Sequence, residues 1–144
     1  MLKVVIDTNV FISATLTPRG NPAKVLKAWQ EGKIDLVISP QILKEIKKVI
    51  FRPRIKKLSS WTDKKRDELI QDLAKIAILT PGSLKLKVVA EDPYDDKFVV
   101  AAVEGKANYI VTGDEHLRKL RSCKGIKVVS PAEFVKILRQ KGIR

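Results

Sequence analysis

The sequence predicts an α/β fold in which a central parallel sheet of about five strands carries helices on both faces. Short apolar runs of strand length alternate along the chain with longer segments of helical periodicity, and this alternation is typical of a parallel sheet. No repeat, low-complexity tract or Ser/Gly-rich linker interrupts the 144 residues. We therefore expect a single domain that spans residues 1–144.

Local sequence signals predict each element in turn. Strands are expected at residues 2–7, 35–39, 86–89, 109–112 and 127–129, where apolar and β-branched side chains predominate. Helices are expected at residues 22–32, 40–51, 62–77, 92–104 and 131–140, with a short helix after Asp114. Proline suits the first turn of several of these helices, and Gly105 suits the end of one. Turn chemistry predicts a loop at residues 17–22.

The composition indicates a soluble protein that binds a polyanion. Its 29 Lys and Arg residues against 16 Asp and Glu residues produce a net charge of +13, which favours nucleic acid or an anionic membrane surface as partner. No apolar run has the length of a membrane span, and the first residues lack a signal-peptide pattern. We expect a cytoplasmic location and no membrane partner. The single cysteine, Cys123, excludes an internal disulfide and a cysteine-based metal site.

Two acidic residues directly follow apolar strands. Asp7 closes the first apolar run, and Asp114 comes after the strand expected at residues 109–112. Ligands in open α/β sheets bind at the carboxyl ends of strands, and a buried carboxylate needs a cation or strong hydrogen-bond donors. Each residue has a simpler alternative role as the N-cap of the following helix.

A third acid, Glu45, lies on the helix expected at residues 40–51. It borders the apolar stripe of this helix, so it can reach inward at the end of the sheet. The alternative is a solvated Glu45 that pairs with Lys44 or Lys48, and position on the helix alone favours this alternative.

The fourth acid is Asp96, near the start of the helix expected at residues 92–104. It shares a face with Val99, Val100 and Val103, which places it toward a crevice at the end of the sheet. The alternative is that its charge only complements the helix macrodipole. The adjacent Asp92 and Asp95 already suit capping positions.

A shared site explains all four acids better than four separate structural roles, because each is expected at the same end of the sheet. Clustered carboxylates at neutral pH have raised pKa values unless a cation relieves their repulsion. Oxygen ligands without His or Cys favour Mg²⁺ or Mn²⁺ over Zn²⁺. An acidic centre in a basic chain suits a metal-dependent enzyme that cuts a polyanion.

Four short motifs, in order, resemble those of the PIN-domain family. They are Val5-Ile6-Asp7-Thr8-Asn9-Val10, Ser39-Pro40 with Leu43-Lys44-Glu45-Ile46, Asp96-Lys97-Phe98-Val99-Val100-Ala101-Ala102, and Val111-Thr112-Gly113-Asp114. The resemblance covers almost the whole chain and extends to the VapC-like branch, which is described as the toxin component of toxin–antitoxin systems.

This resemblance implies a three-layer α/β/α PIN-like fold and a Mg²⁺- or Mn²⁺-dependent endoribonuclease, a phosphodiester hydrolase that cleaves single-stranded RNA. The catalytic metal ligands that it implies are Asp7, Glu45, Asp96 and Asp114. The supporting positions are Asn9, Thr112, Asp92 and Asp95, and Asp95 is also the alternative to Asp96 as third ligand. The expected partners are single-stranded RNA, an antitoxin protein and further copies of the chain in a homodimer or larger assembly.

Other functions stay open. One is a catalytically inactive PIN-like RNA-binding scaffold, against which the intact set of four acids argues. Another is an RNA-processing nuclease unrelated to toxin–antitoxin function. A phosphatase with a strand-end Asp nucleophile is disfavoured, because such enzymes have a second Asp where this chain has Asn9, and an amide cannot donate and regain a proton in that role.

Overall fold

The computed structural model describes residues 1–85 and 96–143. Within these ranges the strands are β1 (Lys3–Ile6), β2 (Asp35–Ile38), β3 (Ile78–Leu79), β4 (Tyr109–Val111), β5 (Ser122–Cys123) and β6 (Ile126–Val129). The helices are α1 (Thr8–Leu16), α2 (Asn21–Gln30), α3 (Pro40–Ile50), α4 (Pro53–Leu58), α5 (Asp63–Ile76), α6 (Asp96–Glu104), α7 (Glu115–Arg118) and α8 (Pro131–Gln140).

The strands form one sheet in the order β3-β2-β1-β4-β6-β5. Neighbouring strands are parallel except for β5 and β6, which pair antiparallel. From β1 the chain first builds β2 and β3 on one side, and it then crosses to build β4 and β6 on the other. The direction of winding therefore reverses between β1 and β4, and such a switch point opens a ligand crevice at the carboxyl ends of the strands.

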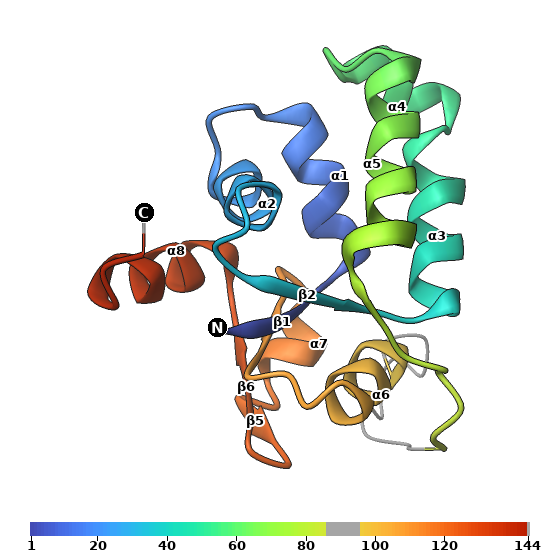
Figure 1. The fold of residues 1–144 in the computed structure, drawn as a ribbon. Coiled ribbons are helices and arrows are strands. Elements are labelled where there is room, and N and C mark those ends of the chain that lie inside the picture. Colours follow the sequence, from blue (N-terminus) through green and yellow to red (C-terminus); the bar gives the residue numbers. More distant parts are fainter. Residues whose placement is uncertain (86–95, 144) are drawn as a thin grey trace.

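Helices cover both faces of the central strands. Figure 1 shows α1 and α2 on one side of β1 and β2, with α6 on the other side, where it contacts β1, β2 and β4. Helix α8 packs against α2. Because β1 is covered twice, its residues Val4, Val5 and Ile6 are all buried, which explains why this strand reads as a continuous apolar run.

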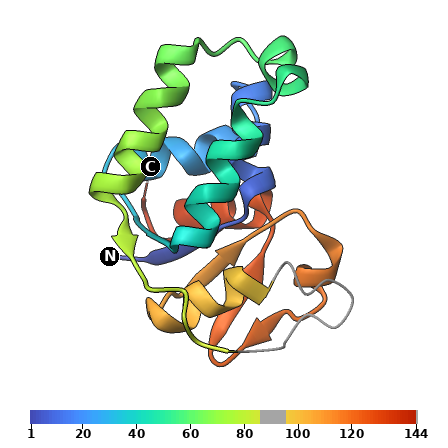
Figure 2. The same ribbon diagram turned by 90° about the vertical axis from the view of Figure 1, so that its right-hand side faces the viewer.

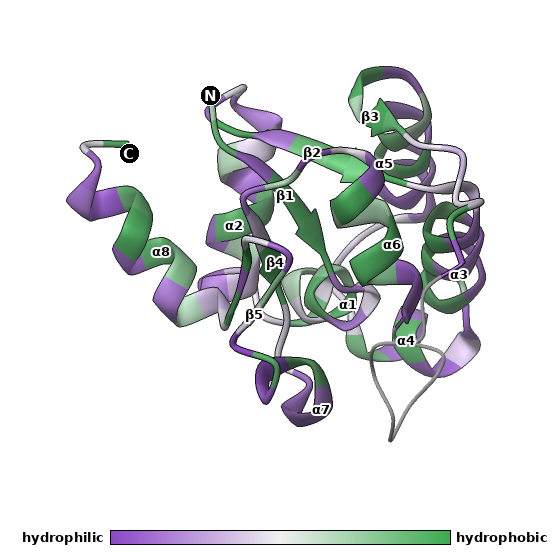
Figure 3. Ribbon diagram, turned by 90° about the horizontal axis from the view of Figure 1, so that it is seen from below, coloured by the Kyte–Doolittle hydropathy of each residue, from purple (hydrophilic) through white to green (hydrophobic). Residues whose placement is uncertain are grey.

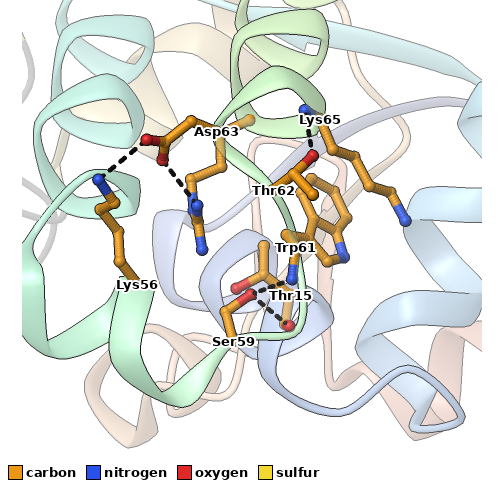
Figure 4. A network of polar contacts seen from close by, with 8 residues as sticks. Thr15, Lys56, Ser59, Trp61, Thr62, Asp63 and Lys65 are labelled. Carbon is orange, nitrogen blue, oxygen red and sulfur yellow. Dashed lines mark hydrogen bonds and ion pairs between the residues drawn. The ribbon is translucent and has the colours of Figure 1, made fainter.

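Helices α3 and α5 lie side by side, and the connection that contains α4 is at their far end from the sheet (Figure 2). Polar contacts fasten this connection, as Figure 4 shows. Asp63 accepts hydrogen bonds from Lys56 at 3.0 Å and from the buried Arg66 at 2.9 Å. The Ser59 hydroxyl donates to the Thr15 carbonyl of α1 at 2.9 Å. The Ser59 contact ties the connection between α3 and α5 to α1.

The core lies between the sheet and its two helical layers. In Figure 3, β1 is coloured mainly as hydrophobic, whereas α8 alternates between hydrophobic and hydrophilic residues. This alternation matches the burial of Phe134, Val135 and Leu138 on one face of α8. None of the helices in the described ranges combines the length and apolarity needed to cross a lipid bilayer.

The predicted α/β fold is confirmed, and the structure adds elements to it. Helix α1 has no counterpart among the expected elements, because most of its residues are buried and a helix buried nearly all round shows no amphipathic period. The short α4, β3 and β5 were likewise unexpected, and β5 makes the sheet mixed at one edge. The strand expected at residues 86–89 and the start of the helix expected at residue 92 lie outside the described residues.

Candidate active site

The carboxyl ends of β1 and β4 meet at the centre of the sheet. Ile6 lies opposite Val111 in the parallel register, and the N–H of Asp7 donates to the Val111 carbonyl at 2.9 Å. The two strands thus deliver Asp7 and Thr112 to one point of the edge, and Asp114 follows two residues later. This point is the switch between β1 and β4 where a crevice is expected.

Asp7 is a buried carboxylate, only 3% exposed. The Thr112 hydroxyl donates to its Oδ2 at 2.7 Å, and the Asn9 N–H donates to its Oδ1 at 3.2 Å. The second bond makes Asp7 the N-cap of α1. The alternative capping role is therefore real, but each carboxylate oxygen keeps a further lone pair for another partner.

Thr112 connects the two strand-end acids. Its side chain is fully buried, and its Oγ1 accepts a hydrogen bond from the Asp114 N–H at 2.9 Å while it donates to Asp7. The Asp114 Oδ1 in turn accepts from the N–H groups of His116 at 2.7 Å and Leu117 at 3.4 Å. Asp114 caps α7, as the sequence predicts, and Thr112 sets its distance from Asp7.

Glu45 turns toward α6. Its Oε2 lies 2.8 Å from the Nζ of Lys97, and the two side chains are 27% and 16% exposed, respectively. The sequence alone favoured a pairing with Lys44 or Lys48 in solvent, whereas this partner comes from a different helix. The contact joins α3 to α6 beside the carboxyl edge of the sheet.

The charges of these acids act on one another. Burial raises the pKa of Asp7, and the negative charges of Asp114 and Glu45 raise it further. The hydrogen bonds from Thr112 and Asn9 lower it, but the net shift is upward from the ordinary value of 3.8. Asp114 and Glu45 therefore lie close enough to Asp7 for their charges to act on it.

The remaining predicted residues have different positions. Asp96 is half-buried in the first turn of α6, next to Lys97. Asn9 is exposed, and its backbone N–H donates a hydrogen bond to the Asp7 side chain. Asp92 and Asp95 lie outside the described residues. Hydrogen bonds join Asp7, Thr112 and Asp114, and the charge of Glu45 acts on the pKa of Asp7. Asp96 lies on the helix that contacts Glu45 through Lys97.

A basic groove of about 610 Å³ lies beside α7. Its charged lining comprises Arg118, Lys119, Arg121 and Lys127 together with Glu115 and Glu133. Glu115 directly follows Asp114, so one end of the groove adjoins the acidic edge of the sheet. A second groove of about 570 Å³ lies between α2 and α8 and is lined by other residues.

Residues 3–116 match the PIN domain family. The chain belongs to the PIN-domain family. PIN domains are typically nucleases that use divalent metal ions, so family membership supports a general nuclease function for this chain. The matched range contains Asp7, Glu45, Asp96 and Asp114.

One relative by sequence and two solved structures are similar to this chain. The uncharacterized protein MJ1680 of Methanocaldococcus jannaschii is 35% identical over 142 residues, which cover 93% of this chain and 90% of the relative. The fold resembles VapBC2 from Rickettsia felis, solved with a DNA fragment from its promoter, with a TM-score of 0.55 and 14% identity over 90% of this chain and 98% of that chain. It also resembles the PIN domain endonuclease Utp24, with a TM-score of 0.52 and 20% identity over 89% of this chain and 84% of that chain.

The divalent cation that a PIN domain implies fits this site by its chemistry. A carboxylate whose pKa is raised by burial and then by two neighbouring carboxylates gains stability from a cation, and carboxylate oxygens are the ligands that Mg²⁺ and Mn²⁺ prefer. Across residues 1–85 and 96–143, no three acidic, His or Cys side chains are gathered closely enough to hold an ion as they stand.

Sequence reasoning missed the ion pair between Lys97 and Glu45 in this PIN domain. The Lys97 ammonium pairs with Glu45 across two helices, and the only signal in the sequence was its position beside Asp96. It also missed Thr8, whose buried Oγ1 has no hydrogen-bond partner among the described residues. Both features depend on which helices the fold packs together.

Proposed function

We propose that this PIN domain is a Mg²⁺- or Mn²⁺-dependent endoribonuclease that cleaves single-stranded RNA as the toxin of a toxin–antitoxin pair. The observation that carries the proposal is the convergence of negative charge on the buried Asp7, whose pKa is raised by burial and then by Asp114 and Glu45. In a chain of net charge +13, an acidic centre of this kind calls for a cation and a polyanionic substrate.

Four residues would hold the metal in this proposal: Asp7, Glu45, Asp96 and Asp114. When bound, a divalent cation supplies an activated water and a counter-charge for the scissile phosphate. Thr112 fixes the orientation of the Asp7 carboxylate through its 2.7 Å hydrogen bond, and its bond to the Asp114 N–H keeps both acids in register. No nucleophilic side chain is required.

The basic groove beside α7 supports an RNA substrate. Arg118, Lys119, Arg121 and Lys127 line it, and it adjoins the acidic edge through Glu115. Cationic side chains bind backbone phosphates without regard to base sequence. We propose that an RNA strand whose scissile phosphate is at the acidic edge continues along this groove.

The partners follow from the same proposal. The likeness in fold to VapBC2 supports an antitoxin protein as partner, and the VapC-like motifs support a homodimer or larger assembly. We further propose that residues 1–144 act as a single domain in the cytoplasm.

Cleavage of single-stranded RNA with Mn²⁺, Mg²⁺ or EDTA tests the activity. We expect cleavage with either metal and none with EDTA. Asp7→Asn, Asp96→Asn and Asp114→Asn should each lower the rate more than about a hundredfold, because each leaves an incomplete metal site, whereas the exposed Glu68→Gln should not. Wild-type rates in all three Asn variants would refute the site. RNA binding without cleavage by the wild type would favour the scaffold.

Calorimetric Mn²⁺ titrations test the individual ligands. Glu45→Gln should weaken Mn²⁺ binding and Glu68→Gln should not, since helix propensity hardly distinguishes Glu from Gln. Asp95→Asn should retain far more activity than Asp96→Asn. The reverse order would move the third ligand by one residue.

An RNA-processing nuclease outside any toxin–antitoxin pair is the second candidate, and the likeness in fold to the PIN domain endonuclease Utp24 favours it. Expression in a bacterial host separates the two functions. Growth arrest by the wild type but not by Asp7→Asn supports a toxin. Cleavage in vitro without growth arrest supports the processing enzyme.

A further inference from the structure

The candidate metal site already contains a cation of its own. The Lys97 ammonium lies 2.8 Å from Glu45 Oε2 and 4.7 Å from the centroid of the Phe98 ring. A carboxylate and the face of an aromatic ring both favour a positive charge. Lys97 therefore occupies a place beside the predicted ligands that is suited to a cation.

This contact is more than a solvent-exposed ion pair. The Lys97 side chain is 16% exposed and that of Glu45 is 27% exposed, so salt and water screen the pair less than they screen a surface pair. The charge of Glu45 reaches Asp7, which places the Lys97 ammonium within the field of the same acidic cluster. Its positive charge lies directly against the Glu45 carboxylate.

We infer that Lys97 is a built-in competitor of the divalent cation, because its ion pair with Glu45 Oε2 lowers the affinity of that carboxylate for the metal. Lys97 thereby sets the metal concentration at which the site fills. This inference rests on the proposed metal-dependent function. It assigns to Lys97 a role in cation affinity, which differs from the role of a metal ligand.

A purely structural role for Lys97 makes the opposite prediction. If the ion pair only positioned Glu45 for the metal, its removal would leave Glu45 less well placed and would weaken metal binding. If Lys97 competes with the metal, its removal frees Glu45 and strengthens metal binding. The direction of the change in metal affinity therefore separates the two roles.

Calorimetric Mn²⁺ titrations of the wild type, Lys97→Met, Lys97→Arg and Lys75→Met test the inference. Lys75 is the matched control, because it is an exposed lysine in the last turn of α5, whereas the ion-pair partner of Glu45 is Lys97. We expect Lys97→Met to bind Mn²⁺ about fivefold more tightly. Lys97→Arg and Lys75→Met should remain near the wild type.

A second comparison tests the mechanism. In a Glu45→Gln background, Lys97→Met should change the Mn²⁺ affinity by much less than it does in the wild type, because the two residues act as a pair. Equal or weaker Mn²⁺ binding by folded Lys97→Met, or equal tightening by Lys75→Met, overturns the inference alone. Absence of Mn²⁺ binding to the wild type overturns the metal-dependent function, and the inference with it.

Discussion

Replacement of Thr112 by Val tests the link between the two strand-end acids. The substitution keeps the shape of a β-branched residue at the end of β4 but removes the hydroxyl. That hydroxyl donates to the buried Asp7 carboxylate at 2.7 Å and accepts from the Asp114 N–H at 2.9 Å. A hydrogen bond to a charged group contributes about 1.5–3 kcal/mol and a neutral one about 0.5–1.5 kcal/mol. We therefore expect Thr112→Val to lower the free energy of unfolding by about 2–4 kcal/mol at pH 7.

Urea denaturation in EDTA measures this change, and Thr8→Val is the matched control. Thr8 is also buried, but its hydroxyl has no partner among the described residues, so its loss should leave stability unchanged or slightly raised. The Thr112 bond lowers the pKa of Asp7, so its contribution is present while Asp7 is ionised. It should shrink as the pH falls through the folded-state pKa of Asp7. Equal losses in the two variants, at every pH, would refute the reasoning.

Three further predictions concern charge. Burial raises the pKa of Asp7 above 3.8, so the stabilising contribution of the Asp7 carboxyl is lost as the pH rises through its folded-state pKa. Asp7→Asn should therefore unfold at higher urea than the metal-free wild type near neutral pH, with an advantage that vanishes below about pH 4. Equal urea midpoints at neutral pH would contradict this. Burial raises the pKa of Glu104, but hydrogen bonds from the N–H groups at residues 82–84 lower it by more, so that the net value falls below 4.5. Glu104→Gln should therefore speed hydrogen exchange of these three amides at pH 7. Unchanged exchange would argue against a role of Glu104 in holding this segment. The RNA-binding constant of metal-free Asp7→Asn should fall by about 0.7 log units per phosphate contact for each tenfold increase in salt concentration. A salt-independent binding constant in filter binding would show that the basic charge serves another purpose.

Much of the fold could be predicted because its signals are local. The cap at Thr62 and the apolar face that follows it predict α5 without reference to any other element. The cap at Asp114 predicts α7 in the same way. Helix α1 could not be predicted by periodicity, because most of its faces are buried, and β3 is too short to have a pattern of its own.

The candidate site divides in a similar way. Asp7 and Asp114 could be placed at one edge from the sequence, because both follow apolar strands and parallel strands end together. Glu45 could not be placed, since the helix face around it suggested a solvated residue. Its true partner, Lys97, belongs to α6, and no spacing within α3 predicts a contact with α6.

The sequence by itself determined the succession of strands and helices, the membership of the PIN-domain family and the acids that follow the strands, because hydrophobic period, capping and motif order are properties of neighbouring residues. Only the tertiary structure decided that β1 lies between β2 and β4, that the Thr112 hydroxyl bonds both to Asp7 and to the Asp114 N–H, and that Lys97 holds Glu45. These contacts join residues far apart in the chain. Their existence depends on strand order and helix packing, which the burial of the whole core determines and no short segment encodes.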